Sequence, residues 1–275
     1  LLVGLGNLGA KRKAVLGDRC VATVDPVNLA ADYRRHDECD PDRYDAAILA
    51  VPNDAKLRLL CYFIDRRKHI LVEKPLIMDS MDPDRLRQRA AVRSSIWYTA
   101  YNFRFEPHVI ALKEQLEAGA IGRVYYVRMV YGNGTAGAIK GTWRDDRYGV
   151  IGDMASHLID LAGFLFGRFG AKFRVLKRHS YELTGPDHCI LTTADLSVVI
   201  ESSFVAWGNT WRIEVVGEEG AMVMEGLTKW GPSSLTFWLR GAHDRTCWTI
   251  TSPDPTLTAD LQHFEERVAR GESSY

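Results

Sequence analysis

The sequence is short of several features that would point to particular classes of protein. Its 275 residues carry 35 Lys and Arg against 35 Asp and Glu, so the formal net charge is zero and no overall basic field exists to hold nucleic acid or an anionic membrane. The longest apolar runs, residues 46–51 and 161–166, fall far short of the roughly 20 residues needed to cross a bilayer. We therefore expect neither a nucleic acid nor a membrane as partner.

Cysteine is also sparse and irregularly placed. The five cysteines are an odd number without any C-x-x-C spacing or accompanying histidine cluster, which argues against a disulfide framework and a zinc site. We expect no metal and a reducing cytoplasmic location. The chain opens on Leu1 inside an apolar run, so we expect residues to precede it.

The first hundred residues alternate β-rich runs with segments of helical length, a pattern typical of βαβ units and a parallel sheet. Strands are predicted at residues 1–5, 20–24, 46–51, 69–72 and 96–100, and helices at 7–16, 53–65 and 83–92. A further helix is predicted from Pro107 to about residue 116. The pattern indicates a doubly wound Rossmann-type domain of the α/β class.

After residue 122 the composition changes to long stretches rich in Val, Tyr, Trp and Thr. Strands are predicted at residues 123–131, 173–180, 189–194, 196–206, 212–216, 221–225, 235–239 and 246–251, with helices at 153–166 and 258–269. These elements predict a second, α+β domain with a large open, mainly antiparallel sheet. We place the domains at residues 1–120 and 121–275, with the final helix able to pack back toward the first domain.

Gly4, Gly6 and Gly9 form a complete G-x-G-x-x-G between a predicted strand and a predicted helix. Glycine is required first for the tight turn, second for close approach to a pyrophosphate and third for packing of helix on strand, and the helix N-terminus then faces the anion. Asp25 ends the next strand, where a carboxylate accepts hydrogen bonds from an adenosine ribose. No arginine adjoins Asp25, so NAD is predicted over NADP. The alternative is a glycine-rich turn beside an ordinary surface aspartate.

Lys74 stands between an apolar strand and Pro75, at the carboxyl end of the predicted fourth strand. Ligands of open α/β sheets bind at this rim, so the lysine is aimed at the binding crevice. From the residues alone, a catalytic lysine and a solvated loop charge are equally well supported.

Asp153, His157 and Asp160 share one face of the predicted helix 153–166, because positions i, i+4 and i+7 lie together. A histidine flanked by carboxylates can act as a general base near neutral pH. The alternative is a buried, satisfied histidine between surface aspartates, and the spacing alone leaves both open.

Five segments stand in one order along the chain: the glycine motif, Glu-Lys-Pro at 73–75, Tyr-Asn-Phe-Arg-Phe at 101–105, Trp-Arg at 143–144 and Gly-Asp-x-x-x-His-x-x-Asp at 152–160. In this order and spacing they resemble the glucose-fructose oxidoreductase / inositol dehydrogenase (Gfo/Idh/MocA) family over essentially the whole chain. Other parts of the sequence are similar to members of this family from bacterial nucleotide-sugar and surface-polysaccharide pathways. Ile151 precedes Gly152 at a position where many relatives have a glycine-rich segment leading into the helix, which is a mild departure from their pattern.

The resemblance implies an NAD-dependent oxidoreductase that moves a hydride between nicotinamide and a secondary alcohol or ketone of a sugar, with a nucleotide-linked sugar expected. His157 is then the base, Lys74 hydrogen-bonds the same substrate oxygen and Asp153 orients substrate or base. The resemblance also implies a cis bond between Lys74 and Pro75. A homodimer or homotetramer through the second sheet is expected, and a cluster of five tryptophans that one thin sheet cannot easily cover points the same way: Trp207, Trp211, Trp230, Trp238 and Trp248.

These implications define three sets of site residues. The cofactor set is Gly4, Gly6, Asn7, Leu8, Gly9, Asp25, Pro52, Asn53, Glu73 and Lys74. The substrate set is Asn102, Arg104, Trp143, Arg144, Asp153 and His157, and the catalytic set is Lys74, Asp153 and His157.

Three other functions stay open. One is an enzyme of the same family that uses bound NAD for transient oxidation in glycoside cleavage. Another is a non-catalytic sensor or scaffold that keeps the dinucleotide fold. The third is a reductase of an unrelated small carbonyl compound, which the basic residues Arg104, Arg144 and Arg147 disfavour.

Overall fold

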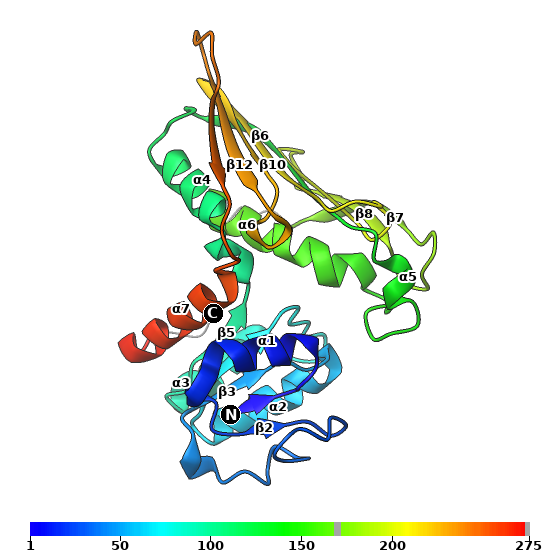
Figure 1. The fold of residues 1–275 in the computed structure, drawn as a ribbon, viewed down its shortest axis with the longest axis vertical. Coiled ribbons are helices and arrows are strands. Elements are labelled where there is room, and N and C mark those ends of the chain that lie inside the picture. Colours follow the sequence, from blue (N-terminus) through cyan, green and yellow to red (C-terminus); the bar gives the residue numbers. More distant parts are fainter. Residues whose placement is uncertain (168–171, 273–275) are drawn as a thin grey trace. The chain divides into compact units, whose positions relative to one another are not determined.

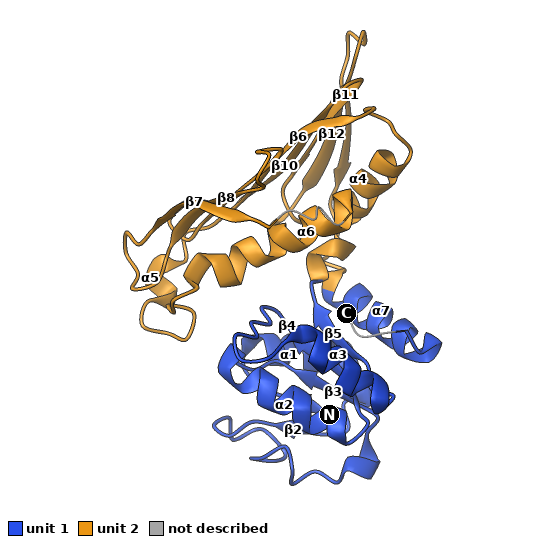
Figure 2. Ribbon diagram, turned by 180° about the vertical axis from the view of Figure 1, so that it is seen from behind, with its two compact units in different colours: residues 1–101, 257–275 blue, residues 102–256 orange. Residues whose placement is uncertain are grey.

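The structure is a computed structural model that describes residues 1–167 and 172–272. The chain divides into two compact units (Figure 2). Unit 1 comprises Leu1–Tyr101 together with Leu257–Tyr275, and unit 2 comprises Asn102–Thr256. Each unit has its own sheet and its own hydrophobic core, so each is described by itself.

Unit 1 is built on a five-stranded parallel sheet with the strand order β2-β1-β3-β4-β5 (Figure 1). Its elements are β1 (Leu2–Val3), α1 (Asn7–Leu16), β2 (Thr23–Val24), β3 (Ala46–Leu49), α2 (Asn53–Asp65), β4 (His69–Glu73), α3 (Pro83–Val92), β5 (Trp97–Ala100) and most of α7 (Thr256–Arg270), with 3-10 turns at Gly17–Arg19 and Pro41–Arg43. The chain order reverses at β1 and β3, which is the point of an open α/β sheet where ligands bind.

Side chains of the unit 1 strands alternate between two apolar layers. One layer joins strand residues such as Val3, Leu49 and Val72 to the apolar side chains of α2 and α3. The other joins Leu2, Ile48 and Leu71 to α1 and to Leu261 and Phe264 of α7. A strand that is buried on both faces has a continuous apolar sequence. This explains why polar and apolar residues do not alternate along these strands.

Unit 2 is built on an eight-stranded sheet with the order β13-β12-β11-β10-β6-β9-β8-β7. All neighbouring strands are antiparallel except β6 and β9, which are parallel. The elements are α4 (Pro107–Glu117), β6 (Val124–Gly132), α5 (Ala136–Ile139), a π-helical turn (Ile151–Ala155), α6 (Ser156–Phe166), β7 (Arg174–His179), β8 (His188–Thr192), β9 (Val198–Ser203), β10 (Thr210–Gly217), β11 (Gly220–Glu225), β12 (Ser233–Leu239) and β13 (Thr246–Ile250), with 3-10 turns at Asn102–Phe105 and Thr228–Trp230. The predicted fold class is confirmed by both sheets.

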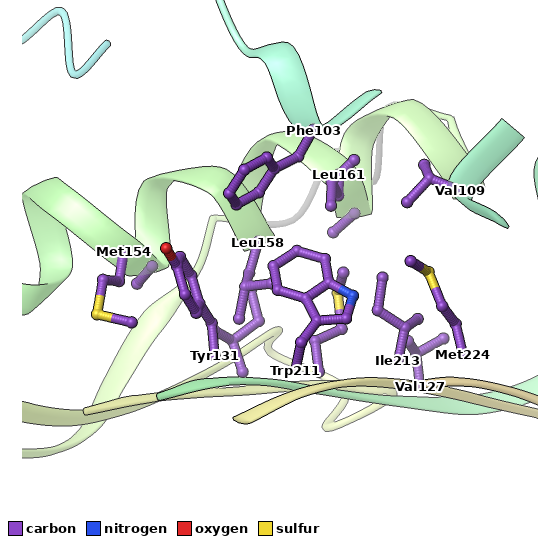
Figure 3. Packing of buried hydrophobic residues seen from close by; sticks show 14 of the residues in the cluster. Phe103, Val109, Val127, Tyr131, Met154, Leu158, Leu161, Trp211, Ile213 and Met224 are labelled. Carbon is purple, nitrogen blue, oxygen red and sulfur yellow. The ribbon is translucent and has the colours of Figure 1, made fainter. Parts of the chain in front are cut away.

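Helices α4 and α6 lie along one face of the unit 2 sheet (Figure 1). Figure 3 shows Tyr131 and Trp211 pointing from the strands toward Phe103 on the helical side of the core. The other face carries ion pairs, including Arg128–Glu214 and Arg212–Glu225. One sheet face is therefore covered by the unit's own helices, and the opposite face mixes these ion pairs with apolar side chains such as Val130 and Val199.

Several details differ from the sequence-based expectations. The expected boundary at residue 120 lies inside unit 2, because α4 contacts β11 and β12. Gly4 turns the chain away directly after β1, so β1 ends earlier than predicted. The premise that the tryptophans lack cover was wrong for Trp211, which is buried in the unit 2 core, whereas Trp207 is 83% exposed.

All five cysteines are free. Within residues 1–167 and 172–272 we find no helix whose length and apolar character would let it cross a membrane.

Candidate functional site

Each of the three motif glycines has a different spatial role. Gly4 has φ of +93°, and a Cβ there would lie 2.3 Å from the carbonyl oxygen of Ala50 on the neighbouring chain segment. A Cβ on Gly9 would lie 2.0 Å from the carbonyl oxygen of Gly4, so the third glycine lets α1 pack on the turn. A Cβ on Gly6 would meet nothing within 4 Å. The second glycine therefore faces open space at the start of α1.

The N-terminus of α1 provides the donors at this open position. Asn7, Leu8 and Gly9 form its first turn, whose N–H groups have no acceptor inside the helix. Gly6 is the N-cap and offers no side chain, and no acidic residue occupies the first turn. An anion placed here would meet backbone donors and the positive end of the helix dipole.

Asp25 lies beside the glycine turn and is tied to it. Its Oδ2 accepts the N–H of Leu5 at 2.7 Å, and its Oδ1 accepts the N–H groups of Val27 and Asn28 at 2.9 and 2.8 Å. Burial raises the pKa of Asp25, but these backbone donors outweigh it and the net pKa is lowered. The carboxylate is therefore ionised and keeps lone pairs for a ribose hydroxyl.

An arginine that the local sequence did not reveal lies close to Asp25. Arg34 donates from NH1 to the carbonyl oxygen of Asn28 at 2.7 Å and to that of Asp25 at 3.4 Å. NAD was expected because no arginine adjoins Asp25 in the sequence, whereas the fold brings Arg34, nine positions further along the chain, to this loop. Its positive charge offsets part of the repulsion that Asp25 would exert on a 2′-phosphate.

Lys74 follows β4 at the carboxyl edge of the parallel sheet, and the bond between Lys74 and Pro75 is cis, as expected. Glu73 Oε1 accepts a hydrogen bond from Arg12 at 2.6 Å. The Nζ of Lys56 donates to the carbonyl oxygen of Pro75 at 2.5 Å. Both residues that adjoin Lys74 are thus bonded to side chains of neighbouring helices.

Pro52 and Asn53 begin α2, and Asn53 also contacts the segment after Lys74. The Oδ1 of Asn53 accepts the N–H of Ile77 at 2.9 Å, and its Nδ2 donates to the carbonyl oxygen of Ile77 at 3.2 Å. This two-way contact fixes the chain beyond the cis bond. Glu73 and Asn53, both expected to bind cofactor, thus have structural partners within unit 1, and their cofactor contacts stay a prediction.

In unit 2, Asp153 lies in the π-helical turn that precedes α6. The N–H of Ser156 bonds the carbonyl oxygen of Ile151, five residues back, as a π turn requires. Such single π turns are frequent at functional sites. The expected regular α-helix from residue 153 was wrong for this first turn, which is π-helical, and α6 begins at Ser156.

The two helix carboxylates hold two arginines. Asp153 accepts hydrogen bonds from Nε of Arg144 at 3.1 Å and from its NH2. Asp160 accepts a bidentate pair from Arg104, with Nε at 2.7 Å. Burial raises the pKa of Asp160 although Arg104 lowers it. The expected substrate residues Arg104 and Arg144 are thus bonded to the carboxylates that flank His157.

His157 is only 4% exposed and packs in an aromatic cluster. Its ring is stacked on Phe103, with centroids 4.0 Å apart and planes at 17°. Tyr131 lies edge-on at 6.2 Å, and Trp211 contacts both Phe103 and Tyr131. Burial, and then the charge of Asp153, raise the pKa of Tyr131, so the phenol stays protonated.

The aromatic cluster is the part of the site that sequence reasoning missed. Lys229 adds a cation to it, 4.4 Å from the Phe103 centroid and 5.6 Å from that of Tyr131. Phe103 stands inside a segment already singled out for its motif, which is a signal that could have been used. Tyr131 and Lys229 come from unrelated strands and turns, so no local pattern links them to His157.

The remaining expected substrate residues are more peripheral within unit 2. Asn102 donates from Nδ2 to the hydroxyl of Thr256 at 2.6 Å, and Trp143 is 58% exposed. Within the part of the chain that the structure describes, no group of three or more His, Cys, Asp and Glu could hold a metal ion.

Residues 109–223 match the family model described as the GFO/IDH/MocA C-terminal domain. These residues lie within unit 2, so the likeness to this family is shown for that part of the chain. The predicted family resemblance is confirmed, and the match covers β6, α6 and the strands up to β11.

Curated relatives extend the likeness into unit 1. The levoglucosan dehydrogenase of Pseudarthrobacter phenanthrenivorans is 30% identical over 155 residues, 54% of this chain and 39% of the relative. The inositol 2-dehydrogenase of Mycolicibacterium gilvum is 27% identical over 213 residues, 74% of this chain and 57% of the relative. The chain thus spans about two fifths to three fifths of the length of these two relatives.

Solved structures share the fold over nearly the whole chain. A levoglucosan dehydrogenase in complex with NADH and L-sorbose has a TM-score of 0.82 at 19% identity, covering 100% of this chain and 90% of that chain. An inositol dehydrogenase homolog from Azotobacter vinelandii, complexed with NAD+, has a TM-score of 0.77 at 17% identity, covering 98% and 86%. At these identities the likeness establishes the fold.

Proposed function

We propose that the chain is an NAD-dependent oxidoreductase that transfers a hydride between nicotinamide and a secondary alcohol or ketone of a sugar or polyol. The observation that carries the proposal is the glycine turn, in which Gly6 leaves open space before the first-turn donors of α1. The names of the relatives, inositol 2-dehydrogenase and levoglucosan dehydrogenase, support a sugar or polyol as substrate.

The residues of unit 1 fit a dinucleotide. The N–H groups of Asn7, Leu8 and Gly9 would bind the pyrophosphate, and the ionised Asp25 would accept from the adenosine ribose. When bound, the nicotinamide supplies the hydride acceptor or donor of the reaction. These groups of unit 1 would bind the cofactor, orient it and keep other molecules from contacting it.

In the proposed mechanism His157 removes the proton from the substrate hydroxyl during oxidation and returns it during reduction. The ring plane of His157 is set by its stack on Phe103, so its nitrogens have a defined direction. Asp153 acts together with Arg144, since these two side chains are hydrogen-bonded. Their pair would orient the substrate beside the π-helical turn.

Lys74 is proposed to hydrogen-bond a substrate oxygen and to stabilise the negative charge that develops on it. Its position at the carboxyl end of β4 and the contacts that hold Glu73 and Pro75 support this role. Lys74 and His157 belong to different units, so each assignment is tested by its own variants.

The test is a titration of NAD and NADP followed by a substrate panel, read by nicotinamide absorbance. The panel contains free polyols and sugars, such as myo-inositol and levoglucosan, and nucleotide-linked sugars. Turnover of the free compounds is the expected result. Turnover of nucleotide-linked sugars alone would favour the narrower class implied by the sequence resemblance, and binding without any turnover would favour a sensor.

A second candidate within the same family is a glycoside-cleaving enzyme that oxidises its substrate only transiently. Such an enzyme would release sugar without net reduction of added NAD. Product analysis by mass spectrometry alongside nicotinamide absorbance distinguishes it from a dehydrogenase.

We also propose a homo-oligomer formed through the unit 2 sheet. Trp238 on β12 and Trp248 on β13 are each 41% exposed, which supports an interface near the β13 edge. The ion pairs on the face opposite α4 and α6 would make such an interface partly polar. Light scattering that finds only a 31 kDa particle at micromolar concentrations would refute the proposal.

A further inference from the structure

We propose that Arg12 and Lys56 are positioning residues that hold the turn bearing Lys74 from both sides. The proposal rests on the proposed function for the role of Lys74, and its test is designed so that the two can fail separately. Arg12 acts on Glu73, the residue before the lysine, and Lys56 acts on Pro75, the residue after it.

Arg12 reaches the turn from α1, the helix that begins at the glycine motif. Its side chain is 0% exposed, and its Nε donates to Glu73 Oε1 at 2.6 Å. The same guanidinium donates from NH2 to Asp260 Oδ2 at 2.5 Å and from NH1 to the carbonyl oxygen of Leu257 at 3.2 Å. Because a guanidinium is a rigid planar fork, contacts with α7 on its far side also restrict where Glu73 can lie.

Lys56 reaches the turn from α2. Its side chain is 2% exposed, and its Nζ donates to the carbonyl oxygen of Pro75 at 2.5 Å. Asn53, one turn earlier on the same helix face, bonds both backbone groups of Ile77. The chain on the far side of Lys74 is therefore held at two successive points by one helix.

Burial of these two cations is expensive, and a well-packed apolar side chain of similar volume is often neutral or stabilising at such a position. Arg12 and Lys56 are nevertheless among the largest fully buried side chains of the described chain. Both end at residues covalently bonded to Lys74. A requirement to fix the direction of that lysine explains why charge, rather than apolar bulk, occupies these two places.

The variants that test the proposal are Arg12→Met and Lys56→Met, which keep the aliphatic volume and remove the donors. Lys11→Met on α1 and Arg58→Met on α2 are matched controls, since both side chains are exposed on the same helices. Arg12→Lys and Lys56→Arg restore a cation with altered geometry and measure rescue.

Two readouts are needed. The first is the rate of reductive methylation of Lys74, followed by mass spectrometry with Lys13 as internal reference, and it needs neither substrate nor cofactor. The second is steady-state kinetics with the sugar or polyol that the panel identifies. NADH affinity, measured by fluorescence, shows whether the dinucleotide turn is intact.

We expect the two Met variants to change Lys74 methylation several-fold while Lys13 is unaffected. The kcat should fall by about 10-fold to 100-fold, in line with the cost of a misplacement of about 1 Å, with the substrate KM and NADH affinity little changed. The exposed controls should behave as wild type, and the conservative variants should recover part of the loss.

The proposal is overturned if folded Met variants show wild-type Lys74 methylation and wild-type kcat, even when their melting temperature is lower. If a Met variant does not fold, Arg12→Gln and Lys56→Gln, which stay polar but are uncharged and shorter, carry the test, and wild-type methylation and kcat in both would overturn the proposal. Altered Lys74 methylation in a protein that turns over no substrate would support the positioning role and refute the proposed function.

Discussion

The two units hold their candidate functional groups by different means. At the glycine turn of unit 1 the decisive partners are backbone groups: Asp25 accepts three N–H groups, and the backbone packs so closely that a Cβ on Gly9 would lie 2.0 Å from the carbonyl oxygen of Gly4. In unit 2 the partners are side chains, with Asp153 on Arg144 and His157 stacked on Phe103. Backbone geometry is encoded locally by glycine and strand ends, whereas side-chain partnerships depend on tertiary packing.

This difference predicts which substitutions act on chemistry and which act on folding. In unit 1 a new Cβ is enough to remove function or stability. In unit 2 the side chain itself must be exchanged, and a matched buried residue is needed to separate a chemical role from a packing role.

The largest effect is expected from His157→Ala. If His157 is the base, kcat should fall by roughly 10² to 10⁴, the usual range for a positioned general base. NAD affinity should be nearly unchanged, because the glycine turn and Asp25 belong to unit 1. Steady-state kinetics and a cofactor titration measure both quantities.

His108→Ala is the matched control for that variant. His108 is also buried in unit 2, and its Nδ1 lies 3.0 Å from the hydroxyl of Ser233 on β12. Its replacement should lower the melting temperature without a selective loss of kcat. Equal losses of kcat in the two variants would mean that His157 serves packing alone. The contrast between the two units would then no longer hold.

The next effect is expected from two alanine substitutions in the glycine turn. Gly9→Ala forces a Cβ against the carbonyl of Gly4, so it should destabilise unit 1 by about 1 to 3 kcal/mol or more. Gly6→Ala meets no protein atom within 4 Å, so the fold should be unaffected while cofactor affinity falls at least tenfold. Thermal melts and NADH titration separate the two outcomes, and a Gly6→Ala protein with wild-type affinity would refute the dinucleotide site.

Local signals explain which elements were predicted well. Helix α3 begins as predicted at Pro83, since Asp82 caps it by accepting the N–H of Asp84. The glycine motif predicted the tight turn after β1 in the same way. Such signals lie within a few residues of the element that they define, so one sequence is enough to read them.

Other features could not be read locally. The aromatic cluster joins Phe103, Tyr131 and Trp211 from three separate elements, and Arg12 bonds Asp260 across 248 positions of sequence. The π turn at Asp153 leaves no mark in the apolar spacing, since it shifts only a single turn. Tertiary contacts decide the first two.

Asp25→Ala should produce a smaller change, in the choice of cofactor. The wild type is expected to prefer NAD. The variant should bring the dissociation constants for NAD and NADP closer together, because Asp25 no longer repels a 2′-phosphate. Arg34→Met added to the Asp25→Ala variant should increase the difference between the two dissociation constants again, since it removes the nearby cation. Dissociation constants for both oxidised cofactors provide the measurement.

Asp32→Ala is the control for this series. Asp32 also accepts a strand N–H, from Thr23 at 2.8 Å, but it does not contact the glycine turn. Its removal should leave the ratio of the two constants unchanged. Comparable constants for NAD and NADP in the wild type would contradict the preference altogether.

The smallest effect concerns pH and the buried ions of unit 1. Burial raises the pKa of Asp260 to about 6, because desolvation and the nearby charge of Glu73 outweigh the attraction of Arg12. The pKa of Arg12 is raised, as expected of a cation paired with carboxylates. The pairing therefore favours the charged form of Arg12, but it does not keep the pKa of Asp260 low. The folded state then binds the proton of Asp260 more tightly than the unfolded state, and the stability from this group is present below pH about 4 and is lost as the pH rises to about 6.

Asp260→Asn removes this titration while it keeps the shape of the side chain. The free energy of unfolding of the wild type, relative to this variant, should therefore fall between pH 4 and pH 6 by roughly 1 to 3 kcal/mol and stay level above that range. Urea unfolding across this pH range measures it. A difference that instead rises with pH would mean that the ion pair with Arg12 outweighs the desolvation of Asp260.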